Sequence, residues 1–176
     1  NSLGLSGSFL TGFVFALITV SPMWIGSAMS GSLNADVALF VRSALLPGFF
    51  EEFLFRGFLF GLLFRYAGWG FIPSAMIGAL IFGAGHLYQG SSIGESAAIF
   101  GITFMGALWF AWLFIEWDEN LWIPIFLHIM MNASWSLFEV SETALGNPYS
   151  NIFRVATIAL TVVITIVKNK RRNRYA

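Results

Sequence analysis

The sequence contains no cysteine and very little charge. Only 10% of its 176 residues are Asp, Glu, Lys or Arg, whereas a soluble domain carries roughly 25%. So few charges cannot cover a water-facing surface, but 57% hydrophobic residues, with 20 Phe and 7 Trp, suit a lipid-facing exterior. The absence of cysteine excludes disulfides, thiol nucleophiles and Cys-ligated metals. The composition therefore predicts an integral membrane protein.

Basic residues are scarce except at the C-terminal end, where five of the nine lie in the last nine residues: Lys168, Lys170, Arg171, Arg172 and Arg174. This cluster follows an apolar run, which is the usual position of a cytoplasmic juxtamembrane anchor. We therefore expect a cytoplasmic C-terminus. The sequence has no basic stripe of the kind that binds nucleic acid, and no nucleic-acid partner is expected.

Apolar runs that are long enough to cross a bilayer recur along the whole chain. They predict helices over about 9–29, 35–66, 72–87, 94–115, 122–140 and 152–167. Bends are expected near Pro22 and at Pro47-Gly48. The runs lack the alternation of a transmembrane barrel, and no repeat or soluble second domain is visible. We expect one all-α domain over 1–176, a polytopic transmembrane bundle of about six helices in the cell membrane.

Glu51, Glu52 and Arg56 lie in the middle of the second predicted helix, where each charge costs at least about 2.5–3.5 kcal/mol. Glu52 and Arg56 are four residues apart, so they share a face and can form an ion pair. Glu51 is rotated by about 100° from Glu52 and cannot easily use the same arginine. A structural salt bridge explains the pair but leaves Glu51 as a candidate functional residue.

The two histidines of the chain also lie at predicted membrane depth. His86 shares a face of the third predicted helix with Phe82, and His128 shares a face of the fifth with Asn132. Each residue alone is explained by a hydrogen-bonded core histidine or by an asparagine that joins two helices. Together with Glu51, they favour one shared polar cavity.

These segments resemble the signature of the CPBP family, which comprises the CAAX proteases and bacteriocin-processing enzymes and is also called the Abi family. The signature places three short motifs on separate membrane helices. All three occur here in order: Glu51-Glu52-x-x-x-Arg56, Phe82-x-x-x-His86 and His128-x-x-x-Asn132. The resemblance covers about residues 45–136, the motif-bearing core. Family members usually have seven or eight helices, so we expect one or two further N-terminal helices to be missing from this chain.

The resemblance implies an intramembrane endopeptidase that acts on a hydrophobic or lipidated membrane-associated peptide or protein. It also implies three pairs of roles: activation of water by Glu51 and His86, oxyanion binding by His128 and Asn132, and support by Glu52 and Arg56.

Peptide hydrolysis needs a base, a positioned water and stabilisation of a tetrahedral oxyanion. A desolvated glutamate with histidine and asparagine donors can supply these functions without a cofactor, and we favour this mechanism. Zinc is the alternative, since Glu51, His86 and His128 would form a catalytic ligand set with one open position.

Two other functions remain open. A non-catalytic membrane scaffold or bacteriocin self-immunity protein with the same fold would need the Glu52–Arg56 pair, but not Glu51 with two histidines. A transporter or proton relay also uses intramembrane Glu and His, but the chain is small and lacks two matching halves. The intact motifs favour the protease.

Overall fold

The computed structural model describes residues 3–172, and every regular element within that range is a helix. The separate helices are α1 (Phe9–Thr19), α2 (Ser21–Ser30), α5 (Phe71–Gly85), α6 (Ile93–Glu116), α7 (Trp122–Ser136) and α8 (Pro148–Arg172). Between α2 and α5 lies a rod of consecutive helical segments, α3 (Val37–Phe40), η1 (Val41–Leu45), α4 (Leu46–Glu52), η2 (Phe53–Phe60) and η3 (Leu62–Tyr66). A short 3₁₀ turn, η4 (Leu87–Gln89), precedes α6. The predicted all-α fold is confirmed.

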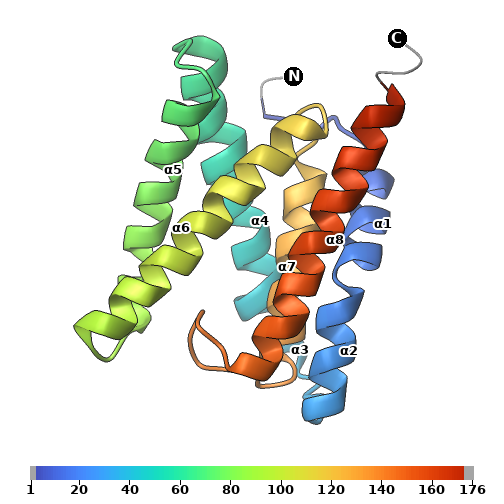
Figure 1. Cartoon of the computed structure of the whole chain (residues 1–176), viewed down its shortest axis with the longest axis vertical. Coiled ribbons are helices and arrows are strands. Elements are labelled where there is room, and N and C mark those ends of the chain that lie inside the picture. The colour runs from blue at the N-terminus through green and yellow to red at the C-terminus, as the bar shows by residue number, and fades with distance from the viewer. Residues whose placement is uncertain (1–2, 173–176) are drawn as a thin grey trace.

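The helices pass up and down the molecule in alternation (Figure 1). In this view α1 and α2 descend, the rod ascends, α5 descends, α6 ascends, α7 descends and α8 ascends, so each pass corresponds to one predicted helix. By length and composition, Phe71–Gln89, α6 and α8 can each cross a membrane, and the bent α1–α2 pair is a fourth candidate. The start of α1 and the end of α8 lie at the same end of the bundle.

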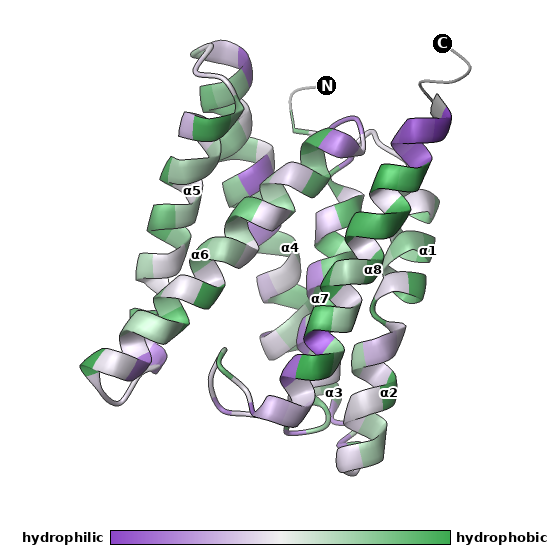
Figure 2. Cartoon of the chain, viewed as in Figure 1, coloured by the Kyte–Doolittle hydropathy of each residue, from purple (hydrophilic) through white to green (hydrophobic). Residues whose placement is uncertain are grey.

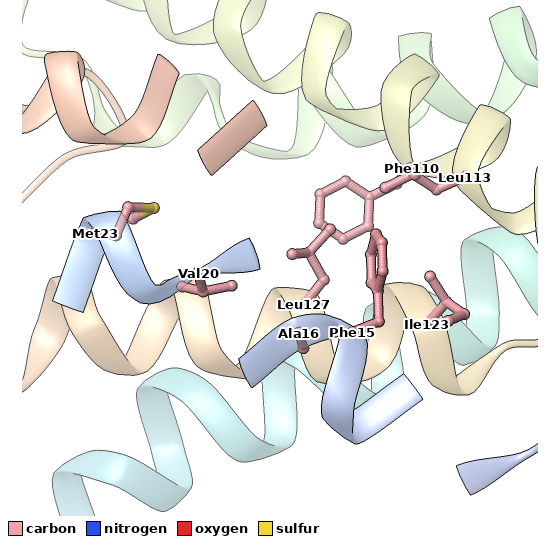
Figure 3. Close-up of a cluster of buried hydrophobic side chains, with 8 residues drawn as sticks. All are labelled: Phe15, Ala16, Val20, Met23, Phe110, Leu113, Ile123 and Leu127. Atoms are coloured by element: carbon pink, nitrogen blue, oxygen red, sulfur yellow. The ribbon is translucent and has the colours of Figure 1, made fainter. Parts of the chain in front are cut away.

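The surface supports a membrane location. Large apolar side chains such as Ile25, Ile72 and Val155 are more than half exposed, and an extended apolar surface of this kind fits contact with lipid. Hydrophilic residues gather at the end of α8 and at the turn that follows α6 (Figure 2). Inside, a cluster from α1, α2, α6 and α7 packs Phe15 against Phe110 and Leu127 and continues through Val20 to Met23 (Figure 3).

The expected bend near Pro22 is confirmed as a 45° break between α1 and α2. Proline has no N–H, so Pro22 cannot donate to the carbonyl of Ile18, its partner in a continuous α-helix. The Ser21 hydroxyl donates to that carbonyl at 2.8 Å instead. The carbonyl of Ile18 therefore keeps a hydrogen-bond donor at the break.

Pro47 behaves differently, because the rod continues through it. The segments η1, η2 and η3 are π-helical, and wider turns of this kind accommodate irregularities that would end an α-helix. The next residue, Gly48, lies against α7: a Cβ at this position would be 2.6 Å from Cγ1 and 2.8 Å from the backbone nitrogen of Ile129. This close approach brings the end of α4 beside α7.

We predict that Gly48→Ala destabilises the folded protein by about 1–3 kcal/mol, because the added methyl group overpacks the contact with Ile129. Gly101→Ala is the matched control, since a Cβ at Gly101 meets nothing within 4 Å. Thermal unfolding in detergent should show a lower midpoint for Gly48→Ala alone. Equal midpoints for the two variants would contradict this account of the α4–α7 contact.

Candidate active site

The buried centre of the bundle is an ion pair at the junction of α4 and η2. Glu52 has no exposed surface and Arg56 is 3% exposed. Nη1 of Arg56 donates to Oε1 of Glu52 at 2.8 Å, as the spacing of four predicts. Nη2 donates to the carbonyl of Ala107 on α6 at 3.3 Å. The guanidinium also lies 5.2 Å from the ring centroids of both Phe82 and Phe110, so aromatic faces partly compensate for its lost hydration.

His128 on α7 lies between the two adjacent glutamates. Its Nδ1 is 2.7 Å from Oε1 of Glu52, and its Nε2 is 3.9 Å from Oε2 of Glu51. An ionised carboxylate can only accept hydrogen bonds, so Nδ1 carries a proton and donates it to Glu52. The Nε2 atom consequently faces Glu51. The side chain of Glu51 is 32% exposed, in contrast to the fully buried Glu52.

The two carboxylate oxygens of Glu52 have different surroundings. Oε1 accepts from both Arg56 and His128, whereas Oε2 is buried and has no hydrogen-bond partner among the described residues. Buried polar atoms of this kind are usually satisfied by a donor such as an internal water. Oε1 of Glu52 is therefore used by Arg56 and His128, whereas Oε2 can accept a hydrogen bond from a small donor.

Asn132 is one turn beyond His128 on α7, and its amide reaches the rod. Nδ2 donates to the carbonyl of Ser43 at 3.3 Å. This carbonyl is four residues before Pro47, so the proline cannot supply its α-helical donor. The helix irregularity thus provides an acceptor that orients Asn132. Sequence reasoning missed this contact, because the sequence shows that Pro47 leaves a carbonyl without its helical donor but not which helix faces that carbonyl.

His86 is the residue directly after α5. Its Nδ1 lies 2.7 Å from the carbonyl of Phe82, to which it donates, and the two rings are 4.5 Å apart. Phe82 in turn packs edge-on against Phe55 of η2 at 5.1 Å and lies below Arg56. Within residues 3–172, no hydrogen bond or ion pair joins His86 to Glu51, His128 or Asn132. The structure thus brings His128 to both glutamates and links His86 to them only through aromatic packing.

The proposed zinc ligands do not form a metal-binding group. Among the described residues, no set of three or more His, Cys, Asp or Glu side chains lies close enough to hold a metal ion. Glu51 and His128 approach each other, but His86 does not complete the set. The donor arrangement therefore does not fit zinc.

Two cavities in the described structure lie elsewhere. One of about 350 Å³ lies between α1 and α8 and is lined by Leu10, Thr11, Val14, Phe15, Ile18, Trp117 and Ile164. Another of about 10 Å³, lined by residues of α2, α7 and α8, is near Trp135. None of Glu51, His86, His128 and Asn132 lines either cavity.

Comparison with known families tests the motif assignment. A family model described as Rce1-like, the type II CAAX prenyl endopeptidase Rce1-like family, matches residues 32–134. This chain belongs to the Rce1-like family. The match includes every motif residue from Glu51 to Asn132 and confirms the family resemblance inferred from the sequence. The family is one of CAAX-type membrane proteases. No curated protein and no solved structure matches the chain.

The two glutamates should differ in their effect on stability. Glu52→Ala leaves Arg56 buried without its carboxylate and removes the acceptor of His128, so we expect a loss of about 3–5 kcal/mol. Glu51→Ala removes a partly exposed carboxylate and should change the unfolding midpoint little. Thermal unfolding of the two purified variants in the same detergent tests the difference. A larger loss for Glu51→Ala would reverse the assignment of the structural and the free carboxylate.

Proposed function

We propose that this protein is an intramembrane endopeptidase that cleaves a peptide bond in a hydrophobic or lipidated membrane-associated substrate. The observation that carries the proposal is the position of His128 between two unlike carboxylates. Glu52 is neutralised by Arg56, whereas Glu51 has no basic partner apart from His128 among the described residues. A free carboxylate beside a histidine inside an apolar bundle is suited to proton transfer.

In the proposed reaction Glu51 is the general base, with His86 helping to position the attacking water. Glu51 accepts a proton from the water while the water oxygen bonds to the carbonyl carbon of the substrate. The carbonyl oxygen becomes an oxyanion. When the tetrahedral intermediate breaks down, the C–N bond is cleaved and Glu51 returns the proton to the leaving amine.

His128 and Asn132 are the proposed oxyanion donors. They share one face of α7, and each has a partner that fixes its orientation: Glu52 for His128 and the Ser43 carbonyl for Asn132. The N–H at Nδ1 of His128 already donates a hydrogen bond to Glu52. Nε2 therefore donates to the oxyanion, which requires the imidazolium form of the ring. Donors that are held in place before the reaction stabilise developing charge most effectively.

We propose a cofactor-free reaction, because the donor set does not fit zinc. Substrate entry from the bilayer is supported by the outer face of the rod, where Phe50 and Phe58 are 59% and 51% exposed. The basic residues at the end of α8 support a cytoplasmic C-terminus for this multi-pass protein.

The alternative is a non-catalytic scaffold or self-immunity protein. The observation in its favour is that Arg56, Glu52 and His128 satisfy one another, as a purely structural network would. Such a protein does not need Glu51, which contributes to none of these bonds. Activity measurements on Glu51 variants therefore separate the two functions.

Glu51→Gln should abolish hydrolysis of a membrane-anchored CAAX-type peptide by the purified protein, because glutamine cannot accept the proton. Asn132→Ala should retain a trace of activity, with turnover lowered by about 10²–10³, the typical effect of losing one oxyanion donor. Both variants should fold, which their unfolding midpoints would verify. Full turnover by Glu51→Gln would refute the proposed base.

Hydrolysis should persist when the protein is treated with a strong zinc chelator. We expect the same turnover with and without chelator, measured on one preparation and one peptide. Activity that is lost with the chelator and restored by added zinc would establish the metal route in place of the glutamate route.

A further inference from the structure

The cavity of about 350 Å³ between α1 and α8 has a volume typical of ligand sites, which span about 300–1,000 Å³. Its lining residues are apolar apart from Thr11. The hydroxyl of Thr11 donates to Ser8 at 2.9 Å, and the indole nitrogen of Trp117 donates to Thr165 at 3.0 Å. The donors of the cavity wall are therefore already used, and the cavity suits an apolar ligand.

The cavity is elongated along α1 and opens toward the outside of the bundle. Leu10, Val14 and Ile18 follow each other at intervals of four residues and form one wall, which is about 12 Å long at 1.5 Å per residue. They are 67%, 41% and 50% exposed, whereas Phe15 is 4% exposed and closes the cavity toward the core. Because α1 belongs to a candidate membrane span, this opening faces lipid, and its shape matches a stretch of acyl chain.

A positive charge lies at the end of the cavity that Trp117 forms. The ammonium group of Lys168 is 4.4 Å from the ring centroid of Trp117. It donates to the carbonyl of Glu116 at 2.9 Å and lies 3.6 Å from Oδ2 of Asp118. A lysine ammonium group has three N–H donors, so Lys168 can still donate to an acceptor at the mouth of the cavity.

Arg171 adds a second positive charge at this end. Ile164, which lines the cavity, shares a face of α8 with Lys168 and Arg171, four and seven residues further on. Arg171 is exposed and forms no ion pair with any residue that the structure describes. Hydrophilic residues gather at this end of α8 (Figure 2), which is also the end at which α1 begins (Figure 1). An apolar cavity with basic side chains at one end is complementary to a lipid with an anionic headgroup.

We propose that the cavity between α1 and α8 binds one anionic phospholipid, with an acyl chain along α1 and the headgroup phosphate at Lys168 and Arg171. Within a bilayer, an acyl chain gains little when it leaves one apolar environment for another. The basic residues therefore determine which lipid is bound. None of the proposed catalytic residues lines this cavity, so the inference does not depend on the proposed endopeptidase function.

The charge is tested by titrating the purified protein in detergent with two lipids that have the same chains, the anionic dioleoyl phosphatidylglycerol and the zwitterionic dioleoyl phosphatidylcholine. Native mass spectrometry should show one bound phosphatidylglycerol, with a dissociation constant about 5- to 25-fold lower than that of phosphatidylcholine, since each nearby basic residue contributes about fivefold. Arg171→Gln should reduce this preference about fivefold. Lys170→Gln is the matched control, because Lys170 is also exposed but is rotated by about 120° from the face of Ile164; its preference should be unchanged.

The acyl-chain position is tested by filling the cavity. Ile18→Trp should abolish the one-to-one complex, whereas Leu17→Trp should preserve it, because Leu17 is similarly exposed, at 56%, but does not line the cavity. Unfolding midpoints without lipid verify that both variants are folded.

Equal affinity for the two lipids, or an Arg171→Gln variant with the full preference, would overturn the inference. Equal effects of the two tryptophan substitutions would also overturn it. A protein that binds neither lipid, or a dimer that excludes lipid in the same spectra, would assign the cavity to another occupant.

Discussion

The buried ion pair between Glu52 and Arg56 organises the helices around it. Arg56 contacts α6 through the carbonyl of Ala107 and α5 through the ring of Phe82, while Glu52 contacts α7 through His128. Removing two charges from water is costly unless their remaining hydrogen-bonding capacity is used. The packing of three neighbouring helices against the rod is the arrangement that provides these partners.

This constraint also separates the two adjacent glutamates. Glu52 points into the bundle, where Arg56 and His128 hold it, whereas Glu51 is one residue earlier and keeps a 32% exposed side chain. Neighbouring carboxylates in unlike environments can take unlike roles, one structural and one reactive. His128 joins the two through its opposite ring nitrogens, so the orientation of a proposed oxyanion donor depends directly on the structural pair.

Much of the fold could be predicted from the sequence, because long apolar runs and the few charges within them are strong local signals. The helices, the break near Pro22 and the Glu52–Arg56 pair all follow from spacing along one segment. The bond between His128 and Glu52 could not be predicted in this way. It joins residues 76 positions apart and depends on how closely α4 approaches α7 at Gly48.

Irregular helix geometry was a second feature that could not be predicted from the sequence. A bend was expected at Pro47-Gly48. The rod is helical on both sides of Pro47, and the Ser43 carbonyl is paired by Asn132. Glu119 lies in the polar turn after α6, and it forms an ion pair with Arg65 at the end of the rod. Both outcomes depend on partners supplied by other helices, which periodicity along a single helix does not encode.

Nitrogen NMR of the histidine rings tests the central claim most directly, because the chain has only two histidines and a His86→Gln variant assigns them. The account predicts that His128 is protonated at Nδ1 and strongly hydrogen-bonded, and that this signal shifts in Glu52→Gln while that of His86 does not. A His128 ring that is protonated only at Nε2 and is unaffected by Glu52→Gln would contradict the account.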